Sequence, residues 1–240
     1  AGTIVRRHIG AAARQIEDHQ AVVDEKSRRI DSTQTEAHNR LPEIVRKHIE
    51  VDYRKPFQRH NVEAFGRLCE RLGQHNGPRM LDSCCGTGMS TYQLARLFPD
   101  TLVNGIDRSD KRLVRGANEW SEKTDNCLLL RADCEDIWRL CVAEKLRFDR
   151  HTIFYPNPYP KNKHFGRRWH GHPVFPTLAK LSVSLELRSN WQPYLLEFSA
   201  AWQLLTGSPG QLIQLEPVQY MTRFEKKYHQ SGHSLFQWNS

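Results

Sequence analysis

Leu81-Asp82-Ser83-Cys84-Cys85-Gly86-Thr87-Gly88 is the stretch from which the fold of this chain is predicted. An apolar strand at residues 80–84 enters a turn with two glycines, and the helical spacing of apolar residues begins after it. Glycines in a strand-to-helix turn allow positive φ angles and close approach of the backbone to a ligand, while the helix N-terminus offers unpaired N–H groups. We therefore expect a ligand-binding loop here, although a purely structural tight turn has the same pattern.

Strands and helices alternate along the chain from residue 61 onward. Strands are predicted at residues 80–84, 102–106, 127–130, 148–154, 183–187, 211–215 and 235–238, and helices at 61–72, 92–98, 110–120, 137–146, 174–181 and 191–205. Asn61 is expected to cap the first helix, because its side chain can accept a hydrogen bond from the first turn. This alternation is typical of a Rossmann-like α/β fold with a mostly parallel sheet and helices on both faces.

Residues 1–60 have a different composition, with twelve Lys/Arg and nine Asp/Glu. Their sparse apolar residues before position 31 are Ile4, Ile9, Ile16, Val22, Val23 and Ile30. Helical spacing resumes with Leu41, Ile44, Val45 and Ile49. Because a weak apolar stripe gives little reason to pack against a core, we expect an N-terminal helical or flexible extension at residues 1–60 and one α/β domain at residues 61–240.

The overall composition limits the class of protein. The 240 residues carry 35 Lys/Arg against 27 Asp/Glu, a formal net charge of +8, which favours an anionic partner such as nucleic acid. Six cysteines occur without Cys-x-x-Cys spacing, so neither a disulfide framework nor a zinc site is indicated, and no metal is expected. No apolar run approaches membrane-spanning length and no signal peptide pattern opens the chain. We expect a cytoplasmic protein without membrane contact; the sequence leaves open whether it is a monomer or a homodimer.

The acid that precedes the glycine turn identifies the class of cofactor. A dinucleotide fingerprint would place three glycines in the turn, but Thr91 stands at the third position. An acid at the end of the first strand suits a ligand with an amino group, which points to S-adenosylmethionine. Asp82 would lie near its methionine part, and Gly86 and Gly88 would permit close approach.

Two further acids support the same cofactor. Asp107 ends the second strand, where a carboxylate can accept both ribose hydroxyls, and Asp133 ends the third, where it can accept the adenine amino hydrogens. A solvated acid at a strand end is the alternative for each one. Three strands that each end on an acid at one sheet edge favour a nucleoside site.

The fourth predicted strand leads into Tyr155-Pro156-Asn157-Pro158-Tyr159-Pro160-Lys161, here called the ledge. Its prolines lack backbone donors and restrict φ, so the strand cannot continue, and a rigid platform follows at the sheet edge where α/β proteins bind ligands. Asn157 is the candidate catalytic residue on it, and a proline-rich loop without chemistry is the alternative.

A basic run occupies residues 161–172, directly after the ledge. Lys161, Lys163, Arg167 and Arg168 are expected to bind RNA phosphates, and its two aromatic residues can stack on bases. A solvated basic loop is the alternative. Its three histidines have no cysteine or acid at metal-ligand spacing, so a metal site is rejected.

Thr222-Arg223-Phe224-Glu225 is the last candidate motif. A carboxylate such as that of Glu225 can accept the N1 and N2 hydrogens of guanine, a donor pattern that adenine lacks. An acid at the surface of a helix is the alternative.

Together these motifs resemble the bacterial tRNA (guanine-N7-)-methyltransferases, which belong to the class I S-adenosylmethionine-dependent methyltransferases. The resemblance runs from about Arg79 to Trp238 and rests most on the ledge, the basic run and Thr-x-Phe-Glu, in that order. It implies a class I methyltransferase fold, tRNA as the partner, and guanine contacts at the following positions: Asn157, Ser189, Asn190, Thr222 and Glu225.

Three motifs depart from the family pattern. Cys84 stands where the family usually has Gly, Asn157 where it has Asp, and Ser189-Asn190 where it has Thr-Asp. Because two carboxylates are amides here, two alternatives stay open. One is a methyltransferase fold that only binds RNA; the other is methylation of an exocyclic amine, for which the Asn157-Pro158-Tyr159 pattern is close but not met.

Overall fold

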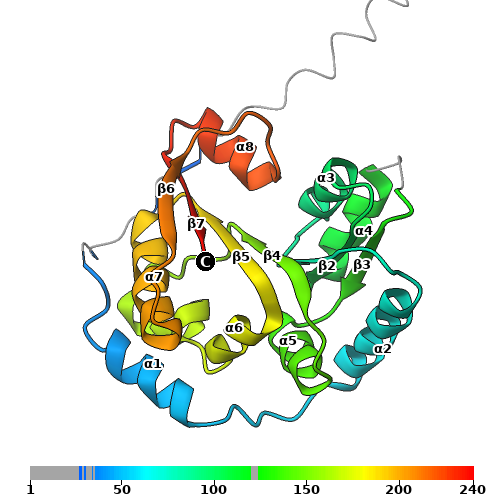
Figure 1. The fold of residues 1–240 in the computed structure, drawn as a ribbon. Helices are drawn as coiled ribbons and strands as arrows, with labels where there is room; N and C mark the ends of the chain where they lie inside the picture. The colour runs from blue at the N-terminus through cyan, green and yellow to red at the C-terminus, as the bar shows by residue number, and fades with distance from the viewer. Residues whose placement is uncertain (1–26, 29, 31–33, 35, 120–123) are drawn as a thin grey trace, which may run out of the picture.

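The computed structural model describes residues 27–28, 30, 34, 36–119 and 124–240. Most of the predicted N-terminal extension, including Ile4 to Val23, lies outside the described residues. A seven-stranded sheet in the order β3-β2-β1-β4-β5-β7-β6 forms the centre of the molecule (Figure 1). β1 to β5 are parallel, and β7 runs antiparallel to both β5 and β6.

The element bounds agree closely with the predicted ones. The strands are β1 Arg79–Ser83, β2 Leu102–Asp107, β3 Cys127–Arg131, β4 Phe148–Phe154, β5 Ser182–Ser189, β6 Gln211–Leu215 and β7 Leu235–Asn239. The α-helices are α1 Leu41–Glu50, α2 Arg59–Gly73, α3 Met89–Leu97, α4 Asp110–Glu119, α5 Cys134–Ala143, α6 Leu178–Leu181, α7 Gln192–Thr206 and α8 Arg223–Gln230. Three 3₁₀ helices, η1 Asn162–Arg167, η2 Trp169–Gly171 and η3 Phe175–Thr177, follow the ledge. The solved structures compared below confirm the predicted class of fold.

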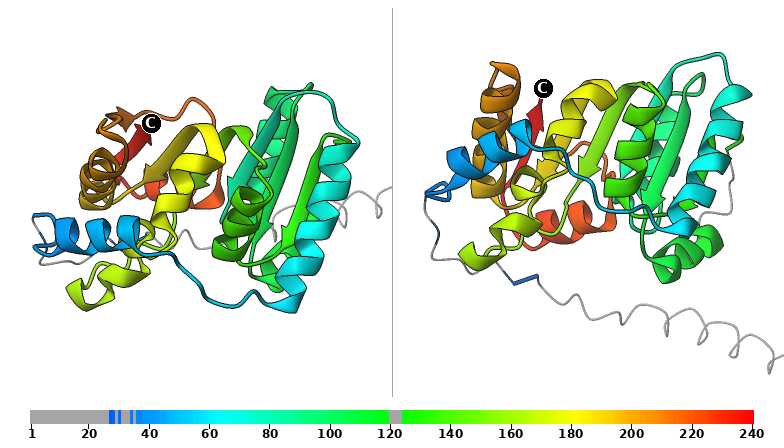
Figure 2. Two further views of the ribbon diagram at one scale, coloured as in Figure 1. Left: turned by 60° about the horizontal axis from the view of Figure 1, so that its bottom comes forward. Right: turned by 90° about the horizontal axis from the view of Figure 1, so that it is seen from below.

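Helices cover both faces of the sheet, and side chains alternate between two cores as a strand requires. On β1, Leu81 belongs to the larger core under α2, α5, α6 and α7, whereas Met80 faces the smaller core with α3 and α8. α1 packs on α7 and adds Leu41 and Val45 to the larger core (Figure 2). Residues 41–50, which fall inside the predicted extension, therefore bury apolar side chains with the main domain.

Two details differ from the sequence-based expectation. Asn61 is not the N-cap of α2; Gln58 occupies that position. Asn61 is fully buried in the second half of the first turn, because its side chain bonds to Asp133 and Asp136 at the start of α5. α8 was not predicted. None of the helices in the described part of the chain is both long and apolar enough to cross a membrane.

His151 on β4 lies fully buried next to the Trp138 ring, with its Nε2 2.8 Å from Ser83 Oγ. Burial lowers the pKa of His151 to about 3. Between pH 6 and 4 the unfolded chain protonates this imidazole and the folded chain does not, so His151 reduces stability as the pH falls. Relative to His151→Asn, the unfolding free energy of the wild type should drop by about 1.4 kcal/mol per pH unit in that window. Urea unfolding at pH 6, 5 and 4 checks this; parallel pH profiles would contradict it.

Candidate functional site

The strand order of the sheet changes direction at β1. β2 and β3 lie on one side of β1, and β4 and β5 lie on its other side. Ser83 at the end of β1 pairs with Ile153 near the end of β4. The glycine loop after β1 and the ledge after β4 consequently leave the sheet side by side. Ligands of open α/β sheets bind at such a switch point.

The loop after β1 has three left-handed residues, with φ angles of 60° at Cys84, 63° at Gly86 and 79° at Gly88. Cys84 thus takes a left-handed conformation that favours glycine, and its Sγ lies 3.8 Å from that of Cys134. Apart from Gly86 and its two chain neighbours, none of the described residues has an atom within 4 Å of the place where a Cβ of Gly86 would be, whereas a Cβ on Gly88 would come within 2.8 Å of Leu129. The loop backbone is therefore open to a ligand at Gly86.

Asp82 lies beneath this loop and has no exposed surface. Its carboxylate accepts hydrogen bonds from Ser90 Oγ at 2.5 Å, Thr91 Oγ1 at 2.7 Å and Thr152 Oγ1 at 2.9 Å. Burial raises the pKa of Asp82 to about 6, against these hydroxyl bonds, which favour the ionised form. In this structure Asp82 anchors the start of α3, and its place beside a methionine amino group stays a prediction.

Asp107 fixes the same loop from the end of β2. Its carboxylate accepts the N–H of Gly86 at 3.0 Å and that of Ser109 at 2.8 Å, and it pairs with Arg112 at 3.1 Å. Only 3% of its surface is exposed. A carboxylate held by backbone donors at the open part of the loop is well placed to meet a ribose, which stays a prediction.

Asp133 precedes α5 and keeps 28% of its side chain exposed. Asn61 holds it at two points, donating from Nδ2 to the carboxylate at 3.1 Å and accepting the backbone N–H of Asp133 at 2.9 Å. Asn61 was not predicted as part of the site. The available signal was a polar residue four and seven positions before Phe65 and Leu68, on the apolar face of its helix.

In the ledge, the exposed Asn157 lies between two tyrosines whose backbone conformation is strained. Tyr155 and Tyr159 both have positive φ angles, 52° and 45°, which are rare for bulky residues. Asn157 is exposed, and its Oδ1 accepts the N–H of Tyr159 at 3.2 Å. Lys161, the last residue of the ledge, and Lys163 and Arg167 of the basic run are exposed as well.

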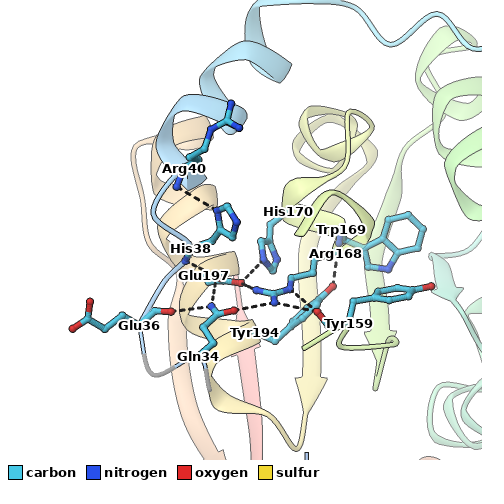
Figure 3. A network of polar contacts seen from close by, with 10 residues as sticks. All are labelled: Gln34, Glu36, His38, Arg40, Tyr159, Arg168, Trp169, His170, Tyr194 and Glu197. Carbon is cyan, nitrogen blue, oxygen red and sulfur yellow. Dashed lines mark hydrogen bonds and ion pairs between the residues drawn. The ribbon is translucent and has the colours of Figure 1, made fainter. Parts of the chain in front are cut away.

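Arg168 corrects one expectation about that run. Its side chain has no exposed surface and forms an ion pair with Glu197 of α7 (Figure 3). The structure therefore does not present this guanidinium to RNA phosphates. A buried cation needs a fixed partner, and Glu197 provides it.

Thr222 and Glu225 form the start of α8. Thr222 Oγ1 accepts the N–H of Glu225 at 3.0 Å, and the Glu225 carboxylate accepts from the N–H of Met221 at 2.6 Å, from Tyr155 Oη at 3.0 Å and from Arg188 at 2.9 Å. Glu225 has no exposed surface. This arrangement ties α8 to the ledge, and recognition of guanine by Glu225 would require it to exchange one of these partners.

Ser189 ends β5, which pairs with the ledge strand β4, and Asn190 follows it. Ser189 is buried and its Oγ accepts the N–H of Trp191 at 3.0 Å. Asn190 is partly exposed, with Nδ2 3.1 Å from Nδ1 of His233. Because β1 to β5 are parallel, the glycine loop, the ledge and the residues that follow β2, β3 and β5 lie at one edge of the sheet. The predicted site residues that keep exposed or partly exposed surface are Gly86, Asp133, Asn157, Lys161, Lys163, Arg167, Asn190 and Thr222. Asp82, Gly88, Asp107, Arg168, Ser189 and Glu225 are buried.

Comparison with known proteins finds methyltransferases, both by the family model and among the relatives in sequence. The family model Methyltransf_4, described as "Putative methyltransferase", matches residues 76–238. The chain is 26% identical over 186 residues to a tRNA (guanine-N(7)-)-methyltransferase of Stutzerimonas stutzeri, which covers 72% of this chain and 73% of that protein. It is 27% identical over 181 residues to a protein of the same name from Leifsonia xyli, which covers 70% of this chain and 77% of that one.

Solved structures show the same fold at lower identity. An antibiotic-related methyltransferase superimposes with a TM-score of 0.54 at 16% identity, covering 78% of this chain and 96% of that one. The 16S rRNA methyltransferase KamB superimposes with a TM-score of 0.54 at 17% identity, covering 79% and 96%. At these identities the likeness concerns the fold alone.

Proposed function

This chain belongs to the Methyltransf_4 family of methyltransferases, and from that premise we propose that it transfers a methyl group from S-adenosylmethionine to N7 of a guanine in tRNA. The observation that carries the proposal is the pairing of β1 with β4, which sets the glycine loop beside the Asn157 ledge. The names of the relatives from Stutzerimonas stutzeri and Leifsonia xyli support the substrate. Since its substrate is tRNA, we place it in the cytoplasm.

The loop fits S-adenosylmethionine on features of this structure. The space over Gly86 is open, Asp107 ends β2, and Asp133 follows the neighbouring strand β3. A backbone N–H of Gly86 holds the carboxylate of Asp107, and the Asn61 amide holds that of Asp133. Gly86 would let the backbone approach the methionine part, Asp107 would accept from the ribose hydroxyls and Asp133 from the adenine amino group. When bound, the cofactor supplies a methyl group on a positively charged sulfur.

The acceptor needs little acid–base chemistry from the protein. Guanine N7 carries a lone pair and no proton, so the new N–CH₃ bond forms as the S–CH₃ bond breaks, without a general base. The positive charge moves from sulfur to the base, and the protein contributes by holding the base in line. Asn157 is the ledge side chain proposed to orient the base, with Asn190 on the neighbouring strand, while Lys161, Lys163 and Arg167 bind phosphates.

An amide at position 157 orients the base but does not offset the charge that develops on it. Asn157→Asp keeps an oxygen for the N–H of Tyr159 and adds a negative charge. A unit charge roughly 5 Å away in a solvated site contributes about 1 kcal/mol, so kcat/KM for tRNA should rise about fivefold. Asn162→Asp, the same exchange at an exposed position of η1, should not raise it. A slower Asn157→Asp enzyme would contradict this role.

Nucleoside analysis of the product tests the proposal. The purified protein is incubated with S-adenosylmethionine and tRNA that lacks 7-methylguanosine, and the digested tRNA is separated by chromatography with mass detection. We expect 7-methylguanosine as the product. N6-methyladenine in its place would instead support methylation of an exocyclic amine, and tRNA binding without any methylated nucleoside would support an RNA-binding role alone.

A further inference from the structure

Arg168 is the buried cation closest in sequence to the ledge, and it touches the ledge directly. Its Nε and Nη2 donate to the carbonyl oxygen of Tyr159 at 3.2 and 3.0 Å. The guanidinium also lies over the ring of Trp191, 4.9 Å from its centroid, and over that of Phe165. A planar fork that holds one carbonyl with two N–H groups fixes its direction as well as its distance.

Tyr159 is the residue that this contact constrains. Its φ angle of 45° is unfavourable for a side chain with a Cβ, and prolines stand on both sides of it. Such a conformation persists only where surrounding contacts impose it. Both polar groups of the Tyr159 backbone are held, the N–H by Asn157 Oδ1 and the carbonyl by Arg168. The orientation of Asn157 is thereby linked to Arg168.

Glu197 on α7 is the counter-charge of Arg168 and has no exposed surface. It accepts further hydrogen bonds from Nε2 of His170 at 2.9 Å, from the backbone N–H of His38 at 2.7 Å and from Nε2 of Gln34 at 2.6 Å. Burial disfavours its charge, but the hydrogen bonds from His170 and His38 and the charge of Arg168 outweigh it and lower the pKa of Glu197 to about 2. The pair is therefore ionised at neutral pH.

Residues from the segment before α1 complete this pair (Figure 3). Gln34 contacts both partners, donating to Glu197 and accepting from Nη2 of Arg168 at 2.9 Å. The His38 ring stacks on Phe165 with centroids 4.3 Å apart. Gln34 and His38 thus contact a buried ion pair whose two members, Arg168 and Glu197, lie far from them in sequence.

We propose that Arg168 is a positioning residue for the methyl transfer: its ion pair with Glu197, completed by Gln34 and His38, holds Tyr159 in its left-handed conformation and so fixes Asn157 on the ledge. Gln34 and His38 are then structural parts of the active site rather than of a separate extension. This inference rests on the proposed function for its kinetic consequence, and its structural consequence is independent of it.

Arg168→Lys tests the kinetic consequence, because lysine keeps the charge opposite Glu197 but cannot hold the Tyr159 carbonyl and Gln34 with one planar fork. We expect kcat with tRNA to fall at least tenfold, while the Kd values for S-adenosylmethionine and tRNA change less than threefold. Arg147→Lys is the matched control, since Arg147 donates to the carbonyl of Ser182 at the opposite end of the sheet; its kcat should stay within twofold. A rise in the Kd for tRNA with unchanged kcat would overturn the inference and restore a phosphate contact.

A double-mutant cycle adds the conformational part of the test. Glycine adopts positive φ without strain, so in the Tyr159→Gly background the further change Arg168→Lys should cost less than a third of its fold-loss in the wild type. An equal loss in both backgrounds would contradict the link through Tyr159.

Amide hydrogen exchange gives a readout that does not depend on catalysis. In the folded state, the peptide covering residues 155–161 should exchange at least fivefold faster in Arg168→Lys and in Gln34→Ala than in the wild type or Arg147→Lys. Unchanged exchange in both variants would overturn the inference. If exchange rises but the wild type makes no 7-methylguanosine, the proposed function fails and the positioning of the ledge stands.

Discussion

Asp107→Ala is expected to remove measurable binding of S-adenosylmethionine while the protein stays folded. The Asp107 carboxylate organises the cofactor loop through the N–H groups of Gly86 and Ser109, and it is the proposed acceptor for the ribose hydroxyls. Hydrogen bonds to a charged group each contribute about 1.5–3 kcal/mol. Without the two hydrogen bonds from the ribose hydroxyls, the Kd for S-adenosylmethionine should rise at least about 100-fold.

Isothermal titration with S-adenosylhomocysteine measures this effect, and Asp149→Ala is its matched control. Asp149 also accepts a backbone N–H, that of Arg79 at 2.7 Å, but it lies at the beginning of β4, on the opposite edge of the sheet. Asp149→Ala should keep the wild-type Kd within threefold. A folded Asp107→Ala protein with an unchanged Kd would contradict the cofactor site.

Glu197→Ala is expected to cause the largest loss of stability. It leaves the Arg168 guanidinium buried without a counter-charge, and such a break typically costs about 3–5 kcal/mol of unfolding free energy. Because the folded pKa of Glu197 is about 2, below that of the unfolded chain, its contribution is fully present at neutral pH and is lost as the pH falls from about 4.5 toward 2.

Urea unfolding at pH 7 compares this variant with Glu43→Ala. Glu43 pairs with Arg40 at 2.8 Å, but both side chains are more than 60% exposed, and such exposed pairs contribute little to stability. Adding Arg168→Met to Glu197→Ala should recover part of the loss, because it removes the unpaired charge. A loss no larger than that of Glu43→Ala would contradict the buried ion pair.

The arrangement of strands and helices could be predicted from the sequence because it depends on local periodicity. β4 has the predicted bounds, Phe148–Phe154, and β1 ends at Ser83, directly before the turn that contains the glycines. α8 carried an available signal too. Thr222 and Glu225 have the Ser/Thr-x-x-Glu spacing of a capping box, and Thr222 caps the helix in the structure.

Burial of charged and polar side chains could not be predicted, because their partners are far away in sequence. Arg168 stands in a run of cations and was expected to bind RNA phosphates, but its partners Glu197 and Gln34 lie 29 and 134 residues from it. Asn61 has the residue type of a helix cap, but its partners Asp133 and Asp136 lie 72 and 75 residues away. Periodicity shows which face of an element is apolar, and it does not show which polar groups meet across elements.

Transfer of a radiolabelled methyl group to two forms of one tRNA transcript tests the proposed reaction most directly. One transcript contains guanosine throughout and the other contains 7-deazaguanosine, in which a C–H group replaces N7 and offers no lone pair. We expect the purified protein to label the guanosine transcript and to leave the 7-deazaguanosine transcript unlabelled, although both bind with similar affinity. Equal labelling of the two transcripts would contradict transfer to N7.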